Sequence, residues 1–123
     1  KKVSVANFLG NLPSGAPIGF SSETVTTAAT LSNTTTISFI SGAATILGDG
    51  TVDGQLKIIA ATGVATTTDV DFIDSAGTTA TVTFQAVGES VSCIYDGTGS
   101  KWHIIAYGAT GTGNNIVGTQ DVT

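Results

Sequence analysis

The chain has 123 residues, only 11% of them charged, and a formal net charge of −5 with four lysines and no arginine. An acidic chain lacks the basic stripe of a nucleic-acid-binding protein, and an anionic membrane surface repels it, so we expect neither partner. The length fits one domain with a substantial core. The chain contains no apolar run of about 18 residues, so no transmembrane helix is expected. A surface this poor in charge suggests a protein partly covered in an assembly.

Residues 1–22 form a distinct segment, because they hold both prolines of the chain, Pro13 and Pro17. Proline lacks an amide donor, so neither a regular helix nor a central strand is expected there. The segment is too apolar for a freely solvated tail; its large apolar residues are Phe8, Leu9, Leu12, Ile18 and Phe20. Two interpretations are open: an arm packed on its own domain, or an arm that contacts a neighbouring subunit. The second also explains the sparse charge.

The first ten residues resemble a signal peptide only loosely. Asn7 and Gly10 interrupt their apolar run before it reaches the usual length. We therefore read these residues as mature sequence, which indicates a protein made in the cytoplasm.

From Glu23 onward, apolar and polar residues alternate with a period of two, and Gly, Asp, Ser and Asn interrupt the alternation. Short strands at a spacing of about 8–12 residues are typical of a β-sandwich or barrel. We predict an all-β domain over residues 23–108, a single small antiparallel sandwich or barrel with extended N- and C-terminal arms. The expected strands are Thr24–Leu31, Thr35–Ile40, Ala43–Leu47, Gly54–Ala61, Thr68–Ile73, Thr79–Ala86, Ser90–Tyr95 and Lys101–Tyr107.

The last two expected strands form the clearest local signal, because two alternating runs flank an Asp96-Gly97 turn. The positions that share a face are Val91, Cys93 and Tyr95 on the first strand and Trp102, Ile104 and Ala106 on the second. Cys93 is the only cysteine, and its position indicates a buried structural thiol rather than a nucleophile. Trp102 is expected in the core or in a seam between subunits.

Residues 109–123 form a tail rich in Gly and Thr. Two interpretations are open here as well. The tail is flexible, or Ile116, Val117 and Val122 add a strand to the sheet edge of a neighbour.

The chain offers little for catalysis. Its one histidine, His103, lies on the solvent side of its strand, and Ser and Asp are too common for a triad to be inferred around it. Asp69 and Asp71 share one face of a strand. A paired-carboxylate glycosidase site is conceivable there, but a solvated sheet face is the expectation.

The stretch Gly48-Asp49-Gly50-Thr51-Val52-Asp53-Gly54 superficially looks like a calcium loop. The EF-hand interpretation fails because Thr51 and Ala60 occupy positions that need ligands. We expect a turn between strands; a weak cation site at Asp49 and Asp53 is the alternative.

Three stretches carry a resemblance to a known family. They are Asp49-Gly50-Thr51-Val52-Asp53-Gly54-Gln55-Leu56-Lys57-Ile58-Ile59, Thr81-Val82-Thr83-Phe84-Gln85-Ala86-Val87-Gly88, and the hairpin with Glu89-Ser90-Val91-Ser92-Cys93-Ile94-Tyr95-Asp96-Gly97 and Lys101-Trp102-His103-Ile104-Ile105. This pattern resembles a module of tailed-bacteriophage virion proteins, and its motifs are structural rather than enzymatic.

The resemblance implies a capsid decoration (cement) protein, which would bind the outer capsid surface of the virion as a homotrimer and stabilise the shell. The major capsid protein would be its partner, and neither a cofactor nor catalytic activity is implied. The alternative is a domain of a tail fibre or appendage that binds a receptor or glycan through exposed Trp102, Tyr107 or His103. A small hydrolase is the third hypothesis. The residues predicted to contact the capsid or another subunit are Phe8, Leu9, Leu12, Ile18, Phe20, Trp102, Ile116 and Val117.

Overall fold

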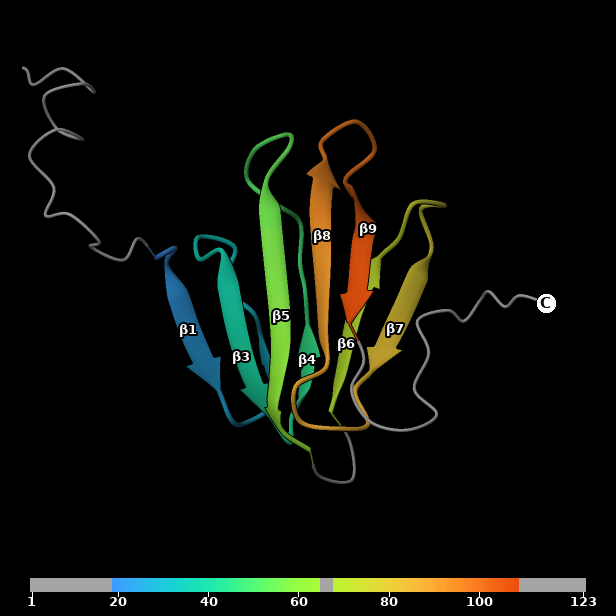
Figure 1. Ribbon diagram of the computed structural model, residues 1–123. Helices are drawn as coiled ribbons and strands as arrows, with labels where there is room; N and C mark the ends of the chain where they lie inside the picture. Colours follow the sequence, from blue (N-terminus) through green and yellow to red (C-terminus); the bar gives the residue numbers. More distant parts are fainter. Residues whose placement is uncertain (1–18, 65–67, 109–123) are drawn as a thin grey trace, which may run out of the picture.

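The strands alternate between two sheets as the chain proceeds, and this alternation defines the architecture. The computed structural model describes residues 19–64 and 68–108. Sheet A has the strand order β1-β3-β5-β8-β9, and sheet B, which lies behind it in Figure 1, has the order β2-β4-β6-β7. The strands are β1 (Ser22–Val25), β2 (Ala29–Thr30), β3 (Ile37–Ser41), β4 (Ala44–Ile46), β5 (Leu56–Gly63), β6 (Asp69–Ile73), β7 (Thr79–Thr83), β8 (Ser90–Asp96) and β9 (Lys101–Gly108).

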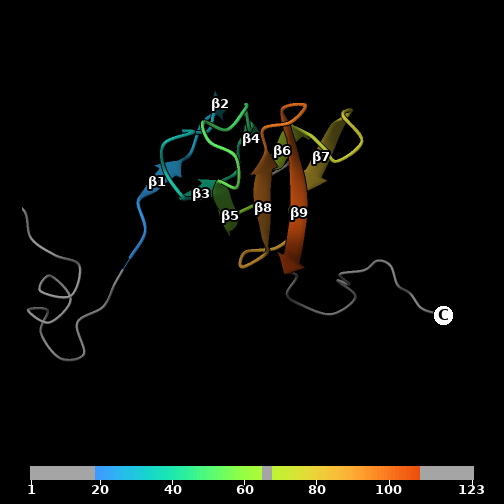
Figure 2. The ribbon, with the colours of Figure 1, turned by 90° about the horizontal axis from the view of Figure 1, so that it is seen from above.

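The first six strands form three stacked coils, each with one strand in each sheet. The pairs β1–β3 and β3–β5 in sheet A are parallel, and so are β2–β4 and β4–β6 in sheet B. The chain thus winds from sheet A to sheet B and back, and each turn lies on the one before it. Figure 2 shows the two layers from above.

The remaining strands pair antiparallel and complete both sheets. β7 folds back on β6, and the β8–β9 hairpin adds to β5. The expected sandwich of two sheets is therefore present, and the barrel alternative is not. The expectation of an antiparallel fold is wrong for the three coils, because a strand that crosses to the other sheet before it returns meets its predecessor in the same direction.

One expected strand proves to be two. Thr24–Leu31 was predicted as continuous, but β1 ends at Val25 in sheet A, and β2 begins at Ala29 in sheet B. The alternation of apolar and polar residues breaks at the corner, where Thr26 precedes Thr27 and Ala28 precedes Ala29, but the corner holds none of the Gly, Pro, Asn or Asp residues that usually mark a turn. The other seven expected strands coincide with β3–β9 to within a few residues.

The core lies between the sheets and consists of the inward positions of each strand. Val91, Cys93 and Tyr95 share the buried face of β8, as predicted. The cluster of buried residues is Leu31, Ile40, Leu47, Ile59, Ala61, Val70, Phe72, Phe84, Val91, Cys93, Tyr95 and Trp102. Its members come from both sheets, so burial of these side chains holds the two layers together.

A β-bulge changes the faces of β9. Cys93 pairs with Ile104, but Ser92 pairs with Ala106, so Ile105 is an extra residue on this strand. An extra residue reverses the alternation beyond it. Ala106 therefore does not share the buried face of Trp102, contrary to the prediction; Tyr107 takes that side and packs against the core. Ile104 and Ile105 are both exposed.

Candidate functional site

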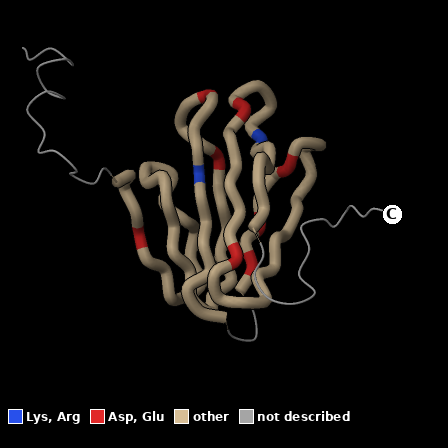
Figure 3. Tube along the Cα trace, viewed as in Figure 1, with Lys and Arg blue, Asp and Glu red and all other residues tan. Residues whose placement is uncertain are grey.

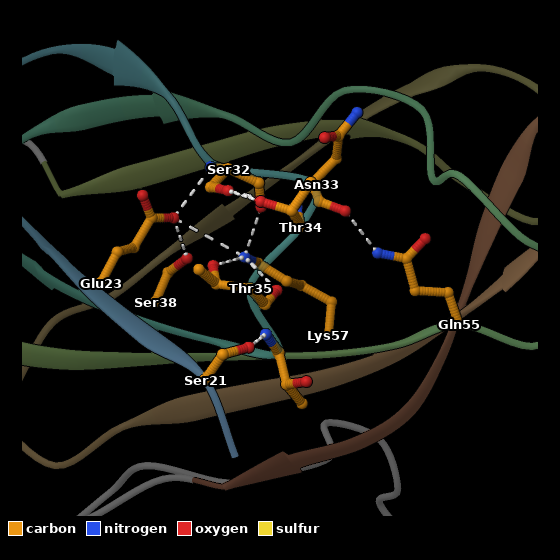
Figure 4. Close-up of polar contacts among 10 residues, drawn as sticks. Ser21, Glu23, Ser32, Asn33, Thr34, Thr35, Ser38, Gln55 and Lys57 are labelled. Atoms are coloured by element: carbon orange, nitrogen blue, oxygen red, sulfur yellow. Dashed lines mark hydrogen bonds and ion pairs between the residues drawn. The ribbon is translucent and has the colours of Figure 1, made fainter. Parts of the chain in front are cut away.

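The side chain of Lys57 is fully buried between the sheets, where it holds three segments of the chain together (Figure 4). Its Nζ donates hydrogen bonds to the carbonyl oxygens of Ser32 at 2.7 Å and Thr35 at 3.0 Å, and contacts Thr35 Oγ1 at 3.1 Å. The carboxylate of Glu23 lies 3.6 Å from the same nitrogen. The ammonium group of β5 thus binds the loop after β2 and the first strand of the fold.

Glu23 completes this polar cluster. Its Oε1 accepts hydrogen bonds from the hydroxyl of Ser38 and from the amide of Ser32, the latter at 2.8 Å. Burial raises the pKa of the Glu23 carboxyl, but these hydrogen bonds and the charge of Lys57 lower it by more, so it lies below its ordinary 4.5. Burial lowers the pKa of Lys57, and Glu23 opposes this change. Each charge therefore has a partner in a region from which water is mostly excluded.

The sequence contained a signal for this cluster that was not used. Lys57 has the same parity on β5 as the buried Ile59 and Ala61. Glu23 and Ser38 are direct register partners on β1 and β3, on the inward side. A charged residue that faces inward on a strand needs a partner of opposite charge or a set of hydrogen bonds. The inward position of Lys57 therefore predicted a polar cluster.

Gln55, two residues before Lys57, joins the turn at residues 48–54 to the loop after β2. Its Oε1 accepts a hydrogen bond from the Thr51 amide at 2.6 Å, and its Nε2 donates to the Asn33 carbonyl at 2.8 Å. Gly50 lies against the ring of Tyr95, where a Cβ atom would come within 2.5 Å of Cγ. Gly50, Gln55 and Lys57 are therefore all engaged in structural contacts.

The turn interpretation of residues 48–54 agrees with these contacts. Asp53 accepts a hydrogen bond from the Gly97 amide at 2.9 Å, which ties this turn to the β8–β9 hairpin. Asp49 is exposed. Among the described residues, no three His, Cys, Asp or Glu side chains gather as a metal-ligand set. The cation site at Asp49 and Asp53 gains no support from this geometry.

His103 has more partners than the sequence indicated. Its Nδ1 lies 2.8 Å from the Ser75 hydroxyl in the β6–β7 turn, and its Nε2 lies 3.0 Å from Asp96 Oδ2. These are the residue types of a catalytic triad, brought together from three places in the chain. The hydrogen bond with His103 is the main reason that the pKa of Asp96 lies below its ordinary value.

The groups around Ser75 do not suit acyl transfer, which needs backbone N–H donors free to bind an oxyanion beside the nucleophile. The amides of Ala76 and Thr78 donate to Asp74 Oδ1, and the Gly77 amide donates to the Asp74 carbonyl. Ser75 is exposed in this turn. The three side chains therefore act as a link between the β6–β7 turn and β9.

The structure places Cys93 and Trp102 in the core. Burial raises the pKa of the Cys93 thiol to about 12, which suits the predicted structural role. The Trp102 side chain is 1% exposed, and its Nε1 donates to the Gly48 carbonyl at 3.0 Å. Trp102 therefore lies in the core of the chain and not in a seam between subunits. Trp102 has almost no surface for a subunit, capsid or glycan contact, so that part of the prediction is wrong.

Of the other predicted contact residues, only Phe20 lies in the described part, and its side chain is 65% exposed. The remainder lie outside the described residues: Phe8, Leu9, Leu12, Ile18, Ile116 and Val117. Asp69 and Asp71 lie on the outer face of sheet B, half-buried among strand neighbours, where the Asp71 carboxylate accepts a hydrogen bond from Thr81. This is the expected polar sheet face.

Comparison of the chain with protein-family models, curated proteins and solved structures finds no match. Within residues 19–64 and 68–108 there is no helix long and apolar enough to cross a membrane.

Replacing Lys57 with Met should lower the free energy of unfolding by about 3–5 kcal/mol, because the substitution leaves Glu23 and two buried carbonyls without their cationic partner. The matched control is Lys101→Met on β9, which should change the same quantity by less than about 0.5 kcal/mol. Urea unfolding followed by Trp102 fluorescence measures both. Equal effects of the two substitutions would contradict the role of Lys57.

The pH dependence of stability should identify Glu23. Its folded-state pKa is lowered, so its contribution is fully present above the unfolded value of 4.5 and is lost as the pH falls through the folded value. The urea midpoint of the wild type should therefore fall with acid below about pH 4.5 more steeply than that of Glu23→Gln. Parallel pH profiles of the two proteins would refute this assignment.

Cys93 should resist thiol reagents in the folded protein, because a pKa of about 12 leaves little thiolate at neutral pH and the side chain is buried. A disulfide-exchange reagent should label it no faster than the protein unfolds, and at once in denaturant. Rapid labelling of one equivalent under native conditions would show an accessible, reactive thiol instead.

Proposed function

We propose that this chain is a structural protein of a tailed-bacteriophage virion, and that it acts as a capsid decoration protein. It binds the outer capsid surface as a trimer and stabilises the shell by adding buried interface between neighbouring capsid proteins. The observation that carries the proposal is that the residues behind the resemblance make structural contacts inside the fold. Gln55, Lys57 and Gly50, which carry much of the resemblance, hold loops and strands together.

The distribution of charge supports the same proposal. The acidic and basic positions are few and lie mainly at turns, on sheet B or inside the cluster around Lys57 (Figure 3). A decoration protein needs extensive contact with other proteins, and a surface with few charges forms such contacts without a large cost of desolvation.

The N-terminal segment supplies the contact with the capsid in this proposal. It carries a high density of large apolar residues directly before β1, and Phe20, the last of them, is exposed. Segments of this kind bind by packing apolar side chains into pockets or by adding a strand to a neighbouring sheet.

A second candidate function, a module of a tail fibre or appendage, is favoured by the stacked parallel coils. β1 and β2 form the edges of the two sheets at the first coil, and each pairs with only one other strand in the described fold; β9 and β7 form the opposite edges. Stacked coils extend naturally at such an end, because each coil contacts only its neighbours. In this alternative the chain is one segment of a longer stack.

The capsid proposal predicts that Phe8→Ser, Leu9→Ser and Leu12→Ser, introduced together, abolish binding to capsids that lack the protein and leave the β-domain folded. The apolar anchors are lost, and the described core is untouched. Co-sedimentation with capsids measures binding, and circular dichroism measures folding.

The matched control is Lys1→Ser with Lys2→Ser, which changes the same segment and should leave capsid binding intact. Normal coating by the triple variant would contradict the proposal. Antibody labelling of intact virions separates the two candidates: many copies spread over the capsid indicate decoration, and a few copies at the tail indicate an appendage.

A further inference from the structure

The outer faces of the two sheets differ sharply in chemistry. On sheet A the outward residues of neighbouring strands pair in the rows Leu56–Ile94, Ile37–Ile58 and Phe39–Ala60. All six are half-buried, although no described segment of the chain covers this face. On sheet B the outward positions of β6 and β7 are Asp69, Asp71, Ile73, Thr79, Thr81 and Thr83.

The outer face of sheet A has the composition of a covered surface. β5 reads Leu56-Lys57-Ile58-Ile59-Ala60-Ala61, so its outward positions are as apolar as most of its inward ones. Strands with apolar residues on both faces are typical of sheets that are buried on both sides. A contiguous apolar patch on the outer side of a sheet, half-buried by its own strand neighbours and covered by no described segment, is a candidate interaction site.

Charge is excluded from the centre of this face. The outward positions of β3 and β5, and those of β8 as far as Ile94, carry no charged side chain. Asp96 and Lys101 pair at the turn end of the β8–β9 hairpin, on the border of the face. The two charges that Figure 3 colours on β1 and β5 are Glu23 and Lys57, and their side chains bind each other on the inward side.

We propose that the outer face of sheet A is an interface between copies of this chain, with a second copy packed face to face against it. Each copy carries a formal charge of −5, so association between copies is least opposed where the contacting surfaces place no like charges close together. Contact through sheet B would bring Asp69 and Asp71 of both copies together. Contact centred on β3, β5 and β8 of sheet A brings together Ile, Leu, Phe, Ala and Ser, with His103 of β9 beside Ile94 at the border. Sheets with apolar outward residues pack face to face by interdigitating those side chains.

This inference goes beyond the proposed function, because a surface packed face to face on its own copy pairs two chains about a two-fold axis, a contact distinct from those within a trimer. The two can fail separately. Self-association is measured on the purified chain without capsids, and capsid binding depends on residues 1–18 in the proposal above.

The test places a charge at the centre of the face. Ile58 pairs with Ile37 on one side and Ser92 on the other, so Ile58→Glu sets like charges against each other in a face-to-face contact. The control is Thr79→Glu, which adds the same charge to the outer face of sheet B. In sedimentation velocity of the full chain, the wild type and the Thr79→Glu control should both have a mass above that of the 12.2 kDa monomer. Ile58→Glu should weaken the association by at least about a hundredfold.

A milder variant covers the case in which Ile58→Glu fails to fold. Ile58→Thr keeps a β-branched side chain suited to a strand and should still weaken the association by about tenfold, because it removes apolar contact area. A monomeric wild type overturns the proposal and leaves residues 1–18 or 109–123 of the same chain as the cover of this face. A folded Ile58→Glu or Ile58→Thr variant that associates like the wild type also overturns it.

Discussion

The ammonium group of Lys57 is the constraint on which the arrangement of the coils depends. A charge removed from water must find partners, and Lys57 finds them in the loop between β2 and β3 and in Glu23 of β1. Lys57 on β5 thereby binds the third coil (β5 and β6) to the first coil (β1 and β2), although the second coil (β3 and β4) lies between them. Parallel coils alone contact only their neighbours, so this link gives the stack a connection that ordinary strand pairing does not supply.

The same polar cluster sets where the apolar core can lie. Glu23, Ser38 and Lys57 take inward positions on three neighbouring strands of sheet A, and the core cluster occupies the positions beyond them. Apolar packing then joins the sheets through residues such as Ile59 and Trp102, while the hydrogen bond from Trp102 to Gly48 holds the loop after β4. The fold therefore combines a hydrophobic layer with a polar cluster at its edge in which each charge has a partner.

Local patterns predicted the strands well but not their partners. A period of two shows that a segment is extended with one face inward, and this holds equally for parallel and antiparallel pairs. The hairpin at Asp96-Gly97 was predictable because its turn chemistry is local. The corner between β1 and β2 and the bulge at Ile105 were not, since both depend on which sheet or strand lies alongside. The Ser75–His103–Asp96 link joins residues 28 and 7 positions apart, and no local rule brings them together.

The residues of chemical interest on this chain are used for structure. Cys93 is buried, His103 joins a turn to an edge strand, and Lys57 binds backbone carbonyls. Among the described residues, the surface that stands out for contact with other molecules is the apolar middle of the outer face of sheet A. In the proposed assembly role, specificity would lie in the shape and polarity of such faces.

Amide hydrogen exchange compared between Lys57→Met and Lys101→Met tests the central claim most directly, because it reports the stability of each segment separately. If Lys57 binds the first coil to the third, its loss lowers the protection of the amides of β1, β3 and the Ser32–Ile37 loop far more than that of β8 and β9, and Lys101→Met leaves both unchanged. An even loss of protection over all strands, or no local loss in the first coil, would contradict the account.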